Sequence, residues 1–123
     1  SMPMATILAV DDSASMRQMV SFTLKGAGYD VKEACDGSEA LNIAKTQKFD
    51  LVLSDVNMPV MDGIQFVTEL RKLGEYKFVP ILMLTTESSG DTKMAGKKAG
   101  ATGWIVKPFN PDQLLNTIKK VLG

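Results

Sequence analysis

Five residues with reactive side chains follow four short apolar segments of the chain. Asp11 and Asp12 come after the first segment, Asp55 after the third, Thr85 after the fourth and Lys107 after the fifth. If these segments are parallel strands, their carboxyl ends lie along one edge of a sheet, where open α/β sheets bind their ligands. The sequence therefore predicts one site that contains three carboxylates, a hydroxyl and an ammonium group.

This combination of side chains suits the transfer of a phosphoryl group. Three converging carboxylates repel each other, and a hard divalent cation such as Mg²⁺ or the Lys107 ammonium can offset that repulsion. A metal ion, a cation and the Thr85 hydroxyl are groups that stabilise phosphoryl oxygens. Carboxylates also form aspartyl-phosphates. We choose Asp55 as the acceptor because it stands alone at its strand end, whereas the adjacent Asp11 and Asp12 suit metal binding.

Each of these residues also has a plainer interpretation when it is taken alone. Asp11 or Asp12 could help to cap the following helix, and Asp55 could be a turn residue. Thr85 could be an ordinary strand-end residue, and Lys107 could be a solvated charge. The prediction of a site therefore depends on the chemical match among the four strand ends.

The elements that must position these residues form a regular alternation. Five apolar runs alternate with five segments of helical period, which predicts a parallel sheet with helices on both faces. The second run is the most polar and is therefore placed nearer an edge, and the segment 86–99 gives the weakest helical signal. The predicted strands cover residues 5–10, 29–34, 51–54, 80–84 and 103–106, and the predicted helices cover residues 13–27, a segment capped by Ser38, residues 64–73, residues 86–99 and a segment capped by Asn110 with Pro111 at its first position.

The composition is that of one ordinary globular domain of 123 residues. Basic and acidic side chains number 14 each, and this balance argues against a nucleic-acid or anionic-membrane surface as the main partner. No apolar run is long enough to span a membrane, and a single cysteine, Cys35, fits a reducing, cytoplasmic setting. The chain has no histidine, so any phosphohistidine must belong to a partner. Ser1 before Met2 indicates an expression scar, so we expect a disordered N-terminus over 1–4 and the domain over 5–123.

The chain resembles the response-regulator receiver family from Leu8 to its last helix. The matching stretches are Leu8 to Ser13, Asp55 to Gly63, Leu84 to Thr86 and Val106 to Phe109. The resemblance implies a flavodoxin-like (βα)5 three-layer sandwich with a five-stranded parallel sheet in the order 2-1-3-4-5. It also implies a two-component phosphoacceptor, which is not an enzyme in the usual sense, with Asp55 accepting phosphate from the phosphohistidine of a sensor kinase.

The resemblance further implies how a metal ion is held. Asp12, Asp55 and the backbone carbonyl of Asn57 would bind Mg²⁺, with Asp11 helping through water. The Lys107-Pro108 bond, which follows the last strand, could be cis, because prolyl peptide bonds tolerate that isomer.

Other positions would bind the phosphoryl group and transmit the signal. Thr85 and Lys107 would contact the phosphoryl oxygens. Asn57 and Glu87 occupy the positions that tune how fast the phosphate is lost in this family, and Asn with Glu is the pairing of CheY. Trp104 stands at the position of the aromatic switch residue, which is commonly Tyr, and it could equally be a half-buried packing residue.

Within the family, the chain looks most like a stand-alone, CheY-like chemotaxis regulator. This implies a CheA-like histidine kinase as the phosphoryl donor. It also implies a downstream target, such as a flagellar switch protein, on the face formed by the fourth helix, the fifth strand and the fifth helix. A phosphatase would be a further partner, and we expect a monomer that neither binds nucleic acid nor inserts into a membrane. A receiver from another pathway, or one excised from a longer regulator, would fit the same motifs.

Three other functions fit the sequence less well. A Mg²⁺-dependent phosphatase of the haloacid-dehalogenase type also uses Asp, Thr and Lys, but its pattern separates the two aspartates by one residue, and the loops here are too short for a substrate cap. A receiver fold that binds partners without phosphorylation would not need the complete set of site residues. A flavin-binding protein is disfavoured because the Ser/Thr-rich phosphate loop after the first strand is missing.

Overall fold

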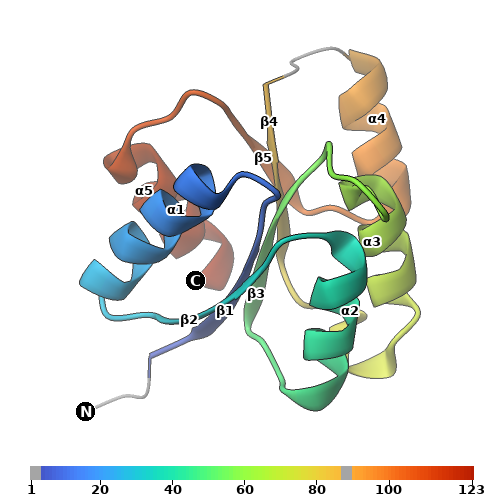
Figure 1. The fold of residues 1–123 in the computed structure, drawn as a ribbon, viewed down its shortest axis with the longest axis horizontal. Coiled ribbons are helices and arrows are strands. Elements are labelled where there is room, and N and C mark those ends of the chain that lie inside the picture. Colours follow the sequence, from blue (N-terminus) through green and yellow to red (C-terminus); the bar gives the residue numbers. More distant parts are fainter. Residues whose placement is uncertain (1–3, 87–89) are drawn as a thin grey trace.

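The fold is a single parallel sheet with helices on both sides, seen in a computed structural model that describes residues 4–86 and 90–123. Five strands lie in the order β2-β1-β3-β4-β5 (Figure 1). The elements in chain order are β1 (Thr6–Val10), α1 (Ala14–Gly26), β2 (Asp30–Ala34), α2 (Gly37–Thr46), β3 (Leu51–Asp55), α3 (Gly63–Arg71), the 3-10 helix η1 (Gly74–Tyr76), β4 (Ile81–Thr85), α4 (Gly90–Ala99), β5 (Gly103–Val106) and α5 (Pro111–Leu122). The predicted flavodoxin-like fold and its strand order are confirmed.

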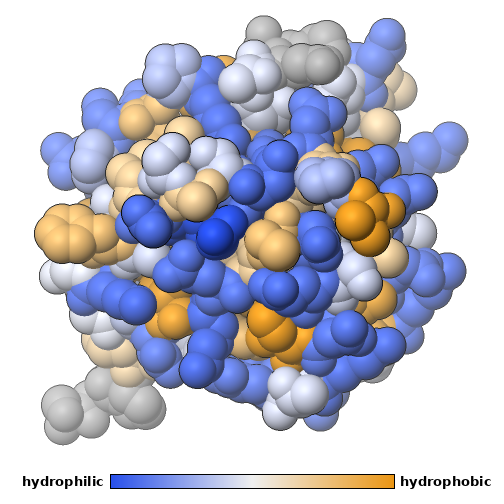
Figure 2. All heavy atoms as spheres, in the orientation of Figure 1, coloured by the Kyte–Doolittle hydropathy of each residue, from blue (hydrophilic) through white to orange (hydrophobic). Residues whose placement is uncertain are grey.

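The helices form two layers around the sheet. α1 and α5 cover one face, and α2, α3 and α4 cover the other (Figure 1). All residues of β3 and β4 are buried, whereas β2 contains exposed, half-buried and buried residues, as expected for a strand at the edge of the sheet. The face drawn in Figure 2 carries apolar residues scattered among hydrophilic ones. None of the described helices is long and apolar enough to cross a membrane.

Several predicted boundaries shift in the structure. α2 is capped by Asp36 and not by Ser38, because the Asp36 carboxylate accepts the Glu39 N–H at 2.8 Å and the helix has already begun at Gly37. The aspartate lies two residues before the predicted cap and has the extended backbone that a cap requires. β3 and β4 each run one residue further than predicted, so that Asp55 and Thr85 are the last residues of their strands.

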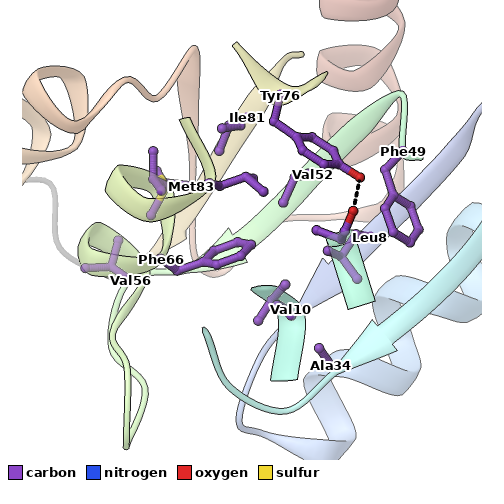
Figure 3. Packing of buried hydrophobic residues seen from close by; sticks show 14 residues of the cluster. Leu8, Val10, Ala34, Phe49, Val52, Val56, Phe66, Tyr76, Ile81 and Met83 are labelled. Atoms are coloured by element: carbon purple, nitrogen blue, oxygen red, sulfur yellow. Dashed lines mark hydrogen bonds between the residues drawn. The ribbon is translucent and has the colours of Figure 1, made fainter. Parts of the chain in front are cut away.

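The core on the α2 and α3 side includes one buried polar anchor, Tyr76. Figure 3 shows its ring among the apolar side chains of this cluster, with its hydroxyl directed at α2. The Tyr76 hydroxyl lies 2.8 Å from the Ala44 carbonyl oxygen and 2.7 Å from that of Gln47. These carbonyls belong to the last turn and C-cap of α2, where no helical N–H is available to pair with them. Tyr76 therefore closes the C-terminal end of α2.

Replacing Tyr76 with Phe is expected to lower the free energy of unfolding by about 1–2 kcal/mol, because a buried and a partly buried carbonyl group lose their shared donor. Urea unfolding followed by circular dichroism measures the change. Tyr29→Phe is the matched control, since Tyr29 is half-buried and has no side-chain hydrogen bond to the described residues, and it should change stability by less than about 0.5 kcal/mol. Equal effects of the two variants would show that the Tyr76 hydroxyl does not stabilise α2.

Candidate functional site

An acidic cluster lies where the central strands end. Val10 of β1 is in register with Ser54 of β3, so the residues that follow them are neighbours. One carboxylate oxygen from each of Asp11, Asp12 and Asp55 lies within 4.8 Å of the others. Asp11 and Asp55 are buried, at 2% and 8% exposure, and Asp12 is exposed. The structure thus brings together the three carboxylates that the sequence placed at one edge of the sheet.

Lys107 supplies the positive charge beside this cluster. Its Nζ lies 3.1 Å from Asp11 Oδ2 and 3.4 Å from Asp55 Oδ2. The Lys107 N–H donates to the Thr85 carbonyl oxygen at 2.8 Å, which fixes the start of its loop to the end of β4. The Lys107-Pro108 peptide bond is cis. The ammonium group therefore bridges the two buried carboxylates of the cluster.

The environment of Asp55 disfavours ionisation more than water does. Burial raises the pKa of the Asp55 carboxyl above its ordinary value, and the neighbouring Asp11 charge raises it further. The Lys107 ammonium lowers the same pKa but does not cancel the effect of burial. An ionised Asp55 is thus poorly compensated in the free protein, which makes the cluster receptive to an additional cation.

Thr85 and Trp104 lie on the same face of the sheet. Asp55 is in register with Leu84, so Thr85 ends β4 next to the end of β3. Met83 of β4 is in register with Trp104 of β5, and Thr85 is in register with Val106. Since side chains two apart on a strand point the same way, the buried Thr85 and the half-buried Trp104 both face the α3 and α4 layer.

The backbone of Asp11 is held by groups that the sequence patterns did not identify. The Asp11 N–H donates to the Ala34 carbonyl oxygen at 3.1 Å, and the Arg17 Nη1 donates to the Asp11 carbonyl oxygen at 2.7 Å. Arg17 is itself oriented by Glu33, with Nε 3.2 Å from Oε1. The helix after β1 is capped by Ser13, whose N–H donates to Asp11 Oδ1 at 2.9 Å. Capping is thus the role of Ser13, and the Asp11 side chain retains Oδ2 for the cluster.

Gly63 ends one of the stretches that match the family, but the sequence patterns supplied no reason for a glycine there. A Cβ atom built on Gly63 would lie 2.1 Å from the Asp55 carbonyl oxygen and 2.9 Å from the Val56 Cα atom. The Gly63 N–H donates to the Val56 carbonyl oxygen at 2.8 Å. The start of α3 therefore packs directly on the backbone that carries the Asp55 side chain, and only a residue without a side chain fits there.

The loop between β3 and α3 contains a strained turn at Val60. Val60 has φ of 69°, which is a rare conformation for a β-branched residue. The Met61 N–H donates to the Pro59 carbonyl oxygen at 2.8 Å, so Val60 is the centre of a γ-turn of the less common, strained kind. The Val60 side chain is 84% exposed and gains little from packing. The strain thus lies in the loop that follows Asp55.

Val60→Asn is expected to raise the free energy of unfolding by about 1 kcal/mol, because Asn tolerates positive φ and the exposed Val side chain contributes little. Thermal unfolding in the absence of divalent ions measures the gain. Val106→Asn, which alters another exposed valine in an extended strand, should not be stabilising. A loss of stability on Val60→Asn would show that the turn does not store strain.

The rate-tuning roles of Asn57 and Glu87 stay predictions, and of the two residues the structure describes only Asn57. Asn57 is exposed in the loop two residues beyond Asp55. Glu87 lies outside the described residues, so its predicted place in the site stays a prediction.

A doubly wound α/β domain with an acidic cluster and a lysine at the carboxyl ends of its strands defines the class of the protein. The sequence model described as "Response regulator receiver domain" matches residues 7–119. The chain belongs to this family and is a receiver domain of the two-component response-regulator type.

Two curated relatives are transcriptional regulators. The probable transcriptional regulator ycf27 of Porphyridium aerugineum is 44% identical over 94% of this chain and 47% of its own length. The alkaline phosphatase synthesis transcriptional regulatory protein PhoP of Bacillus subtilis is 40% identical over 94% of this chain and 48% of its own length. The chain thus spans about half the length of these curated relatives.

Solved structures include similar domains of other kinds. The Vibrio cholerae chemotaxis protein CheY4 is 60% identical with a TM-score of 0.94, over 96% of this chain and 98% of that one. The receiver domain of sensor histidine kinase PA1611 from Pseudomonas aeruginosa is 28% identical with a TM-score of 0.91, over 98% of both chains. That domain was crystallised with a magnesium ion coordinated in its active-site cleft. In this chain, Asp11, Asp12 and Asp55 form an acidic cluster at the carboxyl ends of the strands.

Proposed function

We propose that Asp55 accepts a phosphoryl group from the phosphohistidine of a sensor kinase. The observation that carries this proposal is a buried carboxylate with a raised pKa, held 3.4 Å from the Lys107 ammonium within a cluster of three aspartates. One Asp55 carboxylate oxygen attacks phosphorus as the phosphorus–nitrogen bond of the donor breaks, and the bonding pair leaves with the imidazole nitrogen. The donor lies on a partner because this chain contains no histidine.

The residues around Asp55 fit a divalent metal ion of the Mg²⁺ type. Asp12, Asp55 and the Asn57 backbone carbonyl would hold it, with Asp11 acting through water. Hard oxygen ligands gathered within 4.8 Å are the donor set that such an ion prefers. When bound, the ion would supply positive charge to the phosphoryl oxygens.

Lys107 and Thr85 complete the phosphoryl site. The Lys107 ammonium, which bridges Asp11 and Asp55 in the free protein, would pair with a phosphoryl oxygen once Asp55 is modified. The Thr85 hydroxyl would donate to a second oxygen from the neighbouring strand end. Asn57 and Glu87 would set the lifetime of the product, so the domain assists its own phosphorylation and dephosphorylation.

The phosphorylated form would signal through the face made by α4, β5 and α5. Thr85 and Trp104 face the same layer from adjacent strands, so a shift of Thr85 toward the phosphoryl group leaves room for Trp104 to repack. A partner that prefers the changed face then shifts the population. Similarity to CheY4 across nearly the whole of both chains favours a cytoplasmic chemotaxis regulator, with a CheA-like kinase, a flagellar switch protein and a phosphatase as partners.

A receiver that controls transcription is the second candidate, because two curated relatives are transcriptional regulators. Titrating a flagellar switch protein into the phosphorylated domain separates the two. Binding that strengthens on phosphorylation supports chemotaxis, and binding that is absent in both forms supports the transcriptional pathway.

Incubation with acetyl phosphate and Mg²⁺ is expected to add the mass of one phosphoryl group to the chain, because a small phosphodonor can replace the kinase at a preorganised site. Intact-mass spectrometry measures the addition. Asp55→Asn should add nothing, whereas Asp50→Asn, which alters an exposed aspartate at the other end of β3, should behave as wild type. Modification of Asp55→Asn, or no modification of the wild type, would refute Asp55 as the acceptor. Release of phosphate from simple phosphoesters would favour a phosphatase instead.

A further inference from the structure

Helix α4 has little apolar side-chain contact with the rest of the domain. Among its described residues, Gly90–Ala99, Gly96 alone is buried, while Thr92, Lys93 and Ala99 are half-buried. Helices in proteins are held mainly by the packing of an apolar face, and a helix this short is marginal without such packing. The contact at Gly96 is therefore central to what holds α4 against the sheet.

The group that covers Gly96 is the indole ring of Trp104 on β5. A Cβ atom built on Gly96 would lie 2.5 Å from Cη2 and 2.6 Å from Cζ3 of that ring, well inside the range that real Cβ atoms avoid. The next nearest atom is Cδ1 of Ile64 on α3, at 3.6 Å. The six-membered ring of the indole thus occupies the space of the missing side chain and rests on the α4 backbone.

The C-terminal end of α4 is fixed separately, to α3. The Gly100 and Ala101 N–H groups donate to the Gly96 carbonyl oxygen at 3.1 and 2.9 Å, and Gly100 adopts φ of 115° where the helix ends. Arg71 of α3 donates from Nε and Nη2 to the Gly100 carbonyl oxygen at 3.0 and 2.7 Å. Figure 1 shows α4 next to α3 at the edge of this helical layer. The helix is thus anchored at one end, and the indole supports its middle.

We propose that Gly96 is a positioning residue for Trp104, and that the contact between them couples the indole ring to α4. Because Gly96 has no side chain, the indole ring can rest on the backbone of α4. If the ring moves away from Gly96, α4 loses a principal apolar contact. The helix then loosens about its end at Gly100. The use of this contact in signalling rests on the proposed function, in which Trp104 responds to phosphorylation of Asp55.

Gly96→Ala tests the contact in the unphosphorylated protein. The added methyl group collides with the ring, so acrylamide should quench Trp104 fluorescence more strongly and the amides of residues 90–99 should exchange about tenfold faster. Gly90→Ala is the matched control, because it makes the same change in the same helix where a Cβ atom meets nothing within 4 Å. The control should not speed exchange, since Ala favours helix over Gly. Wild-type quenching and exchange in Gly96→Ala would overturn the proposal.

A rescue experiment separates positioning from a general intolerance of alanine at this site. The Phe ring of Trp104→Phe lacks the Cη2 and Cζ3 atoms that press on Gly96. In that background, Gly96→Ala should slow α4 exchange relative to Trp104→Phe alone, which reverses its effect in the wild type. Equal acceleration by Gly96→Ala in both backgrounds would show that the indole is not the group it displaces.

Phosphorylation provides the test of coupling. With Mg²⁺ and acetyl phosphate, the wild type should show faster α4 exchange, and Gly96→Ala should show a smaller additional change although intact mass finds both proteins phosphorylated. Equal changes in the two phosphorylated proteins would refute the coupling. If neither protein accepts a phosphoryl group, the proposed function fails, while the quenching and rescue experiments still decide the contact.

Discussion

Gly63→Ala is expected to lower the free energy of unfolding by about 3–4 kcal/mol, because there is no room for a methyl group between α3 and β3. The nearest obstacle to the new Cβ atom is the Asp55 carbonyl oxygen, at 2.1 Å, and backbone atoms cannot move aside as the end of a flexible side chain can. Urea unfolding gives the change in free energy. Gly74→Ala, where a Cβ atom would meet nothing within 4 Å, is the matched control and should shift stability by less than about 0.5 kcal/mol.

Gly63→Ala should also slow the phosphorylation of Asp55 by more than the loss of folded protein explains. Relief of the clash pushes α3 and the end of β3 apart, and a displacement of about 1 Å in a reacting group can cost a factor of about 100 in rate. The initial rate of modification by acetyl phosphate, measured at low temperature where the variant stays folded, tests this. A folded Gly63→Ala protein with wild-type stability and rate would show that the close approach at Gly63 is dispensable.

Lys107→Met is expected to destabilise the protein by about 2–3 kcal/mol at neutral pH, because two buried carboxylates lose their shared cation. Met preserves much of the length and apolar stem of Lys, so the loss reports mainly on charge. Lys97→Met is the matched control, since Lys97 is exposed on α4, and it should change stability by less than about 0.5 kcal/mol. Equal stability of Lys107→Met and wild type would show that the bridge contributes nothing to the free protein.

The pH dependence of this variant follows from the carboxyl group of Asp55. The folded-state pKa of Asp55 is raised above 3.8, so between that value and the raised pKa the folded protein binds more protons than the unfolded chain. Stability therefore falls as pH rises through this window. Lys107 lowers the Asp55 pKa, so Lys107→Met should extend the window upward and deepen the fall, and the lost stability should return on acidification.

Two further measurements test the same explanation. Asp55→Asn in the Lys107→Met background should restore most of the stability at neutral pH and flatten its pH dependence, because the poorly compensated charge is gone. Mg²⁺ should stabilise Lys107→Met in proportion to its binding, by about 2.7 kcal/mol at one hundred times the dissociation constant. If neither change restores stability, repulsion between the carboxylates is not the cause of the loss.

The sequence alone was sufficient for the fold class and for the five reactive residues at the strand ends. The reason is that buried parallel strands are short apolar runs, and polar residues at their ends are conspicuous beside them. The last helix was equally readable, because Asn110 and Pro111 form a local start signal whose partner, Gln113, lies three residues away. Predictions of this kind succeed when the interacting groups lie within one turn or one strand.

The cap of α2 was predicted incorrectly from local signals. Ser38 was the predicted cap, whereas the backbone conformation of the loop after β2 makes Asp36 the cap. The helix predicted over 86–99 is described over Gly90–Ala99, and residues 87–89 lie outside the described part of the chain. The residue at which a helix begins depends on the backbone conformation of the loop that precedes it. The periodic pattern of apolar residues contains no information on that conformation.

The tertiary structure alone decided how the site is supported. Arg17 reaches the Asp11 carbonyl, Gly63 packs on the backbone of Asp55, and Gly96 receives the indole of Trp104. Gly63 and Gly96 are glycines that matter because they lack a Cβ atom. The space of that atom is filled by a group from another element. Contacts of this kind join residues that are distant in the chain, and their closeness is set by how helices pack on the sheet. The reactive side chains can therefore be identified from the local sequence, whereas the geometry that brings them together as a site depends on tertiary packing.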